Sequence, residues 1–139
     1  MRTNKFTLGK RSLTNLRGVR PELVAIVRRA IELTLVDFTV IEGVRTQERQ
    51  RQLVRNGASQ TLNSRHLTGH AVDCVPLVNG AIPWNDKTQF KAVSDAMFAA
   101  AKELGVKIRW GGDWNENGRS DDERFYDGPH FELRRQDYP

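Results

Sequence analysis

Apolar residues recur along this chain at both helical and strand spacing, which predicts several helices and short strands. From Pro21 to about residue 34, apolar side chains follow every three or four residues, the pattern of an amphipathic helix. Residues 37–42 (DFTVIE) are rich in β-branched and aromatic side chains and predict a strand. Thr46 can cap a second, very polar helix that runs to about Asn56.

The second half of the chain also predicts both helices and strands. Asn85 or Asp86 can cap a third helix, with Gly105 as its end. Strands are predicted at 70–75, 106–110 and 129–133, and loops at 58–69 and 111–128. We interpret residues 1–19 as an irregular basic arm. The order of elements predicts one α+β domain over residues 1–139, with a small antiparallel sheet packed against about three helices.

Composition and charge narrow the class of protein. The chain has 139 residues, 38% hydrophobic and 28% charged, as in an ordinary globular protein. No apolar run is long enough to span a membrane, and the N-terminus lacks the apolar core of a signal peptide. Residues 1–29 hold eight Lys and Arg against one acid, which favours an anionic partner or simply aids solubility. Aromatic residues are not interleaved with the basic ones, so we expect no nucleic-acid partner.

Two histidines and an aspartate form a candidate metal site. His66 lies just before the strand that contains Asp73, and Gly69 permits a tight turn between them. His130, in the last strand, can supply a third ligand. Two imidazoles and one carboxylate leave a coordination position of zinc open for water, as in catalytic sites. His70 is a competing ligand, but on a strand it faces away from Asp73.

The motifs around these residues resemble the zinc D-alanyl-D-alanine carboxypeptidase/dipeptidase family. They are Ser64-x-His66-x-x-Gly69-x-Ala71-x-Asp73 and Asp127-x-x-His130. Within the family they are most similar to the L-alanyl-D-glutamate peptidases that tailed bacteriophages use as endolysins. The resemblance implies a fold shared with the Hedgehog signalling domain, zinc on the three ligands, and catalysis by the Asp127 carboxylate.

Four further residues have alternative interpretations. Glu132 rivals Asp127 as the general base, or is a hydrogen-bonding partner of His130. Arg45 can bind a substrate carboxylate or stabilise an oxyanion, although its pattern also fits a surface arginine. Ser64 can fix its loop or contact the substrate. Cys74 is the one cysteine, and we interpret it as a buried apolar residue rather than a ligand or nucleophile.

An acidic loop before the last strand predicts a second, calcium-binding site. Oxygen-bearing side chains and one backbone carbonyl follow the order of an EF-hand loop, except that Arg124 replaces the final Glu. The alternative is a solvated acidic turn. The candidate ligands are Asp113, Asn115, Asn117, Arg119 (through its carbonyl), Asp121, Asp122 and Glu123. We expect calcium bound here to regulate the nearby active site, because the resembling endolysin branch includes calcium-regulated members.

These features predict a zinc endopeptidase that cleaves the L-Ala–D-Glu bond of peptidoglycan stem peptides. The alternatives are a D-Ala-D-Ala carboxypeptidase or dipeptidase, and a non-catalytic cell-wall-binding module with structural zinc. We expect a monomer that is made in the host cytoplasm without a signal peptide. It would then act on the cell wall in the periplasm once the membrane is permeabilised. The basic N-terminal region can attract anionic wall polymers.

Overall fold

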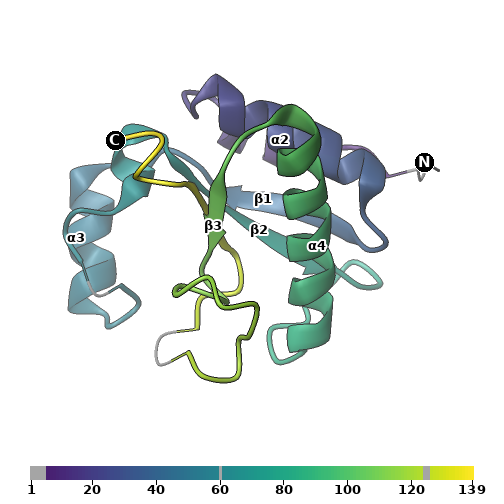
Figure 1. Ribbon diagram of the computed structural model, residues 1–139. Helices are drawn as coiled ribbons and strands as arrows, with labels where there is room; N and C mark the ends of the chain where they lie inside the picture. Colours follow the sequence, from purple (N-terminus) through teal and green to yellow (C-terminus); the bar gives the residue numbers. More distant parts are fainter. Residues whose placement is uncertain (1–5, 60, 124–125) are drawn as a thin grey trace.

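The computed structural model describes residues 6–59, 61–123 and 126–139. Within these ranges the chain forms four α-helices, one 3-10 helix and four strands (Figure 1). In chain order they are α1 (Lys10–Asn15), α2 (Pro21–Leu33), β1 (Asp37–Glu42), α3 (Gln47–Arg55), η1 (Arg65–Thr68), β2 (Ala71–Leu77), α4 (Lys87–Leu104), β3 (Ile108–Trp110) and β4 (His130–Leu133).

The four strands form one antiparallel sheet in the order β1-β2-β4-β3. Helices α2 and α4 pack against each other and, as Figure 1 shows, lie together on one side of the sheet, whereas α3 lies apart on the other side. The core fills the space under α2 and α4. Its largest fully buried side chains include Phe38, Phe131 and Met97. Strand residues that alternate with these core residues face away from the helices and are free to build a site.

Most of the predicted elements are confirmed. The polar helix begins after Thr46, whose side chain accepts a hydrogen bond from the backbone N–H of Arg49. The long third helix starts after Asp86 and ends at Gly105 as expected. The strands agree with the predicted segments to within about two residues. Within the described ranges, no helix is both long and apolar enough to cross a membrane.

The structure corrects two predictions: the loop at 58–69, in which Arg65–Thr68 form the 3-10 helix η1, and the irregular N-terminal arm. Residues 10–15 form helix α1, whose residue Ser12 is fully buried. The Ser12 hydroxyl accepts a hydrogen bond from Val40 N at 2.9 Å, and the Asn15 amide donates to Val40 O at 2.8 Å. Since β1 is an edge strand, these contacts satisfy backbone groups that would otherwise lack a partner strand. The described residues therefore form four α-helices, one more than the sequence predicted. Residues 1–5 of the arm lie outside the described ranges.

Candidate metal centre and active-site cleft

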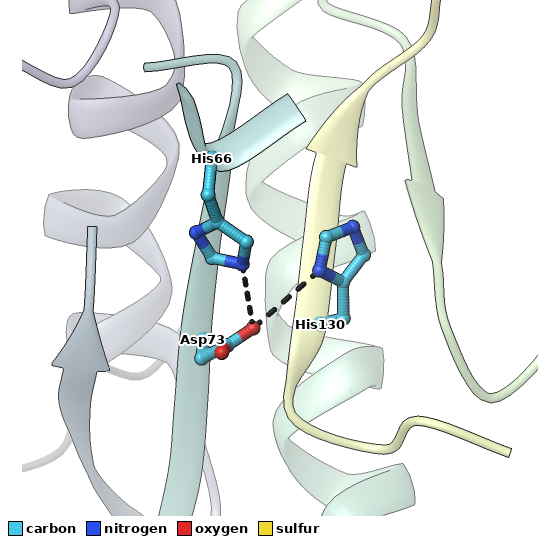
Figure 2. Close-up of side chains that lie close together, drawn as sticks. All are labelled: His66, Asp73 and His130. Carbon is cyan, nitrogen blue, oxygen red and sulfur yellow. Dashed lines mark hydrogen bonds and ion pairs between the residues drawn. The ribbon is translucent and has the colours of Figure 1, made fainter. Parts of the chain in front are cut away.

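The three predicted metal ligands come together on the face of the sheet opposite α2 and α4. Figure 2 shows His66 from η1, Asp73 from β2 and His130 from β4 pointing toward one another. Asp73 Oδ1 lies 3.1 Å from His66 Nε2 and 3.5 Å from His130 Nδ1. One donor atom from each residue lies within 4.8 Å of the others, which is close enough for a single ion to be shared. The cluster can bind a metal ion.

Strand pairing explains how residues so far apart in sequence meet. Asp73 is directly opposite His130 on β4 and opposite Glu42 on β1. The register shifts between Val40 and Glu42, which brings Glu42 rather than Ile41 opposite Asp73. Directly paired residues share one face of a sheet, so this shift completes a polar row across three strands.

Short-range contacts fix the orientation of His66. Ser64 caps η1 by accepting a hydrogen bond from the backbone N–H of His66 at 3.2 Å, and Gly69 ends η1 in the left-handed conformation at φ 76°. That conformation disfavours any residue with a Cβ, and a Cβ at Gly69 would also lie 2.7 Å from Gly18 O. The His66 Nδ1–H donates to Gly43 O at 2.8 Å, which leaves Nε2 free to accept a metal.

The second histidine is oriented by a carboxylate. His130 Nε2–H donates to Glu132 at 2.9 Å, and Arg109 holds the other Glu132 oxygen at 3.1 Å. Nδ1 of His130 is therefore the nitrogen that faces Asp73 and a metal. Burial disfavours the charged ring, but hydrogen bonds to Asp73 and Glu132 outweigh it and raise the pKa of His130 to about 9 in the metal-free protein. The carboxylate–histidine arrangement is the usual support of a metal ligand.

Two aspartates beside the histidines have opposite electrostatic surroundings. Burial alone would raise the pKa of Asp73, yet its two histidine neighbours lower it well below the ordinary value, so this carboxylate stays ionised. Burial and the nearby Asp73 charge raise the pKa of Asp127. A carboxyl group whose pKa lies above its ordinary value is better suited to exchange protons near neutral pH.

The cluster lies in a cleft of about 540 Å³. Asp127, Arg45 and Ser64, the three residues predicted to be catalytic, all line it together with the metal cluster. Two tryptophans also line the cleft. Trp84 is 57% exposed, and the Trp114 ring lies 5.2 Å from the His130 ring. The cleft can hold an extended peptide beside the metal site.

Arg45 is buried and its guanidinium is already bound. It donates to both oxygens of Glu42, at 2.9 and 2.8 Å, and to Gln50 Oε1 at 2.7 Å. A fourth contact reaches Asp73 Oδ2 at 3.4 Å. Arg45 is therefore not the surface arginine that its sequence pattern allowed. Its contacts hold the Asp73 carboxylate in place and leave little donor capacity for a substrate carboxylate.

His70 and Cys74 were both predicted to take no part in the metal site. His70 lies outside the cluster and its Nδ1 is hydrogen-bonded to the Thr68 hydroxyl at 2.7 Å. Cys74 is fully buried, and burial raises the pKa of its thiol, so it is neither exposed nor activated as a nucleophile. Both residues fit the interpretations that excluded them from the site.

Hydrogen bonds connect the predicted calcium ligands of the acidic loop in small groups, among them Asn115 N–H with Glu123 at 3.4 Å and Arg119 N–H with Asn117 Oδ1 at 2.8 Å. Asp113 accepts hydrogen bonds from Asn117 N and Gly118 N, and the Asn117 amide donates to Asp122 at 2.6 Å. The Arg119 side chain forms an ion pair with Asp121 at 3.0 Å. Trp114 connects this loop to the metal cluster through its ring contact with His130.

The sequence analysis anticipated Glu132 as a partner of His130 but missed Gln50 and Glu42, which hold Arg45 beside Asp73. Gln50 is fully buried. Its side-chain oxygen accepts a hydrogen bond from Arg45, and its side-chain nitrogen donates to Thr61 O at 2.6 Å, which links α3 to the loop before η1. Glu42 was assigned only to a strand. A buried position for Gln50 could have been inferred from its place on α3, but its partners depend on the tertiary fold.

A His/Asp/His cluster that can bind a metal, in one cleft with an aspartate whose pKa is raised, is an arrangement typical of metal-dependent hydrolases. Residues 4–134 match the model of the phage L-alanyl-D-glutamate peptidase family, and the chain belongs to that family. It is 46% identical over 134 residues to the L-alanyl-D-glutamate peptidase of Escherichia phage T5, covering 92% of this chain and 98% of that protein.

Two further comparisons agree with this assignment. The L-alanyl-D-glutamate peptidase of Listeria phage A118 is 32% identical over 131 residues, which cover 92% of this chain but 42% of that longer protein. The crystal structure of the Serratia marcescens L-Ala D-Glu endopeptidase ChiX matches with a TM-score of 0.82 and 46% identity. That match covers 94% of this chain and 91% of ChiX. The fold and the family expected from the sequence motifs are confirmed.

Proposed function

We propose that this protein is a zinc-dependent endopeptidase that cleaves the L-Ala–D-Glu bond of peptidoglycan stem peptides as a phage endolysin. The observation that carries the proposal is the His66, Asp73 and His130 cluster, which shares one cleft with Asp127. The nitrogen and oxygen donors suit zinc, and the second nitrogen of each histidine already has a partner. Zinc bound by these residues would supply Lewis acidity for the attack of water on the amide.

The residues around the cluster have distinct proposed roles. Asp127 takes a proton from the attacking water and then donates it to the leaving amine nitrogen. Glu132 is excluded from that task in our proposal, because its two oxygens are held by His130 and Arg109. Arg45 acts through Asp73 as a positioning residue, and Ser64 acts through the backbone of His66.

Digestion of purified peptidoglycan tests the proposed reaction. We expect the wild-type protein to release new L-Ala C-termini and new D-Glu N-termini, identified by mass spectrometry. His66→Ala should abolish both products, whereas His70→Ala, outside the cluster, should retain them. Loss of terminal D-Ala instead would indicate a carboxypeptidase. Zinc binding without any cleavage would indicate the wall-binding module.

We also propose that the 113–123 loop binds calcium and thereby controls the active site. Support comes from the carboxylates of Asp113 and Asp122, which accept hydrogen bonds from the backbone N–H and the side-chain amide of Asn117, and from the Trp114 contact with His130. The test is a titration of cleavage rate with calcium at fixed free zinc. We expect the rate to rise in the wild type and not in Asp113→Ala. Full activity of calcium-free wild-type protein would contradict the proposal.

The proposed setting follows from the proposed substrate. The enzyme would be made in the host cytoplasm and reach the periplasmic cell wall after membrane permeabilisation, acting there as a monomer. The basic N-terminal region, with a net charge of +7 over residues 1–29, would favour approach to anionic wall polymers.

A further inference from the structure

A second pocket, of about 490 Å³, adjoins the catalytic cleft and is rich in arginine. Arg11 and Arg17 project from α1 and its C-terminal end, and Arg49 projects from α3. The two pockets have Ile41 and Glu42 in common, so they form neighbouring parts of one surface.

Tight packing builds this pocket from three elements. Helix α1 lies directly against the end of β1, where a Cβ added to Gly43 would be 1.9 Å from Asn15 O. Only glycine permits this approach. The Asn15 amide is fixed to Val40 O, and the buried Ser12 is fixed to Val40 N. The backbone that carries Arg11 and Arg17 is therefore held in place beside the cleft.

The charge of the pocket is largely uncompensated. Within the described part of the chain, neither Arg11 nor Arg17 has a carboxylate within ion-pair distance. Arg49 is half exposed and lies 3.7 Å from Glu42. Both oxygens of Glu42 are already held by Arg45, so this acid neutralises little of the arginine charge.

The protein residues of the catalytic cleft are rich in carboxylates instead. Its described lining includes Glu42, Asp73 and Asp127, and its arginine, Arg45, is already bound to Glu42 and Asp73. Successive ion pairs lead from Asp73 through Arg45 and Glu42 to Arg49, each at 3.7 Å or less. This path connects the metal cluster to Arg49 in the arginine pocket.

We propose that the pocket formed by Arg11, Arg17 and Arg49 is an anion subsite, next to the catalytic cleft, that binds a carboxylate of the stem peptide. The inference rests on the proposed function. In the stem peptide, D-Glu retains a free α-carboxylate, and residues beyond it carry others. A guanidinium can bind a carboxylate through two parallel hydrogen bonds, which gives both affinity and orientation. The subsite would hold the peptide while the metal site acts on the L-Ala–D-Glu amide.

Steady-state kinetics on a soluble disaccharide-tetrapeptide test this subsite. The substrate is used in two forms, one with free carboxylates and one with those carboxylates converted to amides. We expect Arg11→Gln/Arg17→Gln to raise KM for the free form by about tenfold or more, with kcat little changed, because the lost charge-assisted bonds are those of binding. Arg49→Gln should raise KM in the same direction. Arg51→Gln, on α3 but outside the pocket, is the matched control and should resemble the wild type.

Comparing the two substrate forms shows whether a loss of affinity comes from a lost contact with a substrate carboxylate or from a change that affects any substrate. Wild-type protein should bind the amide form weakly, and the double variant should no longer distinguish the two forms. Arg11→Lys/Arg17→Lys should recover part of the affinity, and thermal unfolding verifies that each variant is folded.

Two outcomes would overturn the proposal: an unchanged KM of the double variant for the free form, and an equal rise in its KM for both substrate forms. An unchanged KM together with weaker binding to whole sacculi would assign the arginines to an anionic wall polymer. If the wild type cleaves neither form, the proposed function fails and the subsite with it.

Discussion

At the scale of single residues, the site depends on which nitrogen each histidine presents. His66 uses Nδ1 to bind Gly43 O, and His130 uses Nε2 to bind Glu132, so opposite ring atoms of the two histidines face Asp73. The sequence spacing gave the identity of the three ligands but not these atoms. They depend on a backbone carbonyl and on a carboxylate two residues along the same strand.

The proposed roles of Asp127 and Glu132 predict that their substitution affects different quantities, turnover and zinc affinity. Asp127→Asn should lower kcat by about 10²- to 10⁴-fold, the usual contribution of a general acid–base, while zinc stays bound. Glu132→Gln should instead weaken zinc binding by about 10- to 100-fold, because it removes the anionic partner of His130. Competition with a chromogenic zinc chelator, measured beside the cleavage rate, separates the two effects. Asp137→Asn, a control at an exposed position, should change neither quantity.

The two roles would be reversed if Glu132→Gln kept full zinc affinity and lost turnover. In that case the hydrogen bond between His130 and Glu132 would be dispensable for the metal, and Glu132 would be the base that the sequence left as an alternative.

At the scale of secondary structure, α1 differs from the other α-helices because it lacks both an apolar stripe and a side-chain N-cap. It has six residues, begins after Gly9 and has no side-chain hydrogen bond at its N-cap. Ser12→Ala would leave Val40 N without its buried partner and should destabilise the protein by roughly 1–3 kcal/mol. Urea unfolding measures this change, with exposed Thr14→Ala as control. An unchanged midpoint would mean that α1 contributes nothing to the stability of β1.

The same contrast explains how much the sequence could predict. Helix α2 carries a continuous apolar stripe, and α3 and α4 have side-chain caps, so their local signals were sufficient. Helix α1 has neither signal. The bulge that places Glu42 opposite Asp73 was also invisible, because register depends on pairing between strands and not on one strand alone. The three residues of the cluster and the contact between Glu132 and His130 were thus predictable, but the contacts of Glu42 and Gln50 with Arg45 were not.

At the scale of the whole molecule, the metal cluster joins η1, β2 and β4, so its charge state affects global stability. In the metal-free protein the pKa of His130 is raised to about 9, whereas an unfolded histidine titrates near 6.5. Protonated His130 therefore stabilises the fold fully below about pH 6.5, and this contribution disappears as the pH rises through about 9.

Thermal unfolding of metal-free protein between pH 6.5 and 9 should show this loss. The two pKa values correspond to about 3 kcal/mol, which should lower Tm by roughly 10 °C across the range. Zinc-loaded protein is the control, because a neutral imidazole binds the metal and zinc stabilises the native state by mass action. Glu132→Gln, which removes one cause of the raised pKa, should move the decline to lower pH. A metal-free Tm that stays constant over this range would show that His130 is already neutral in the folded protein.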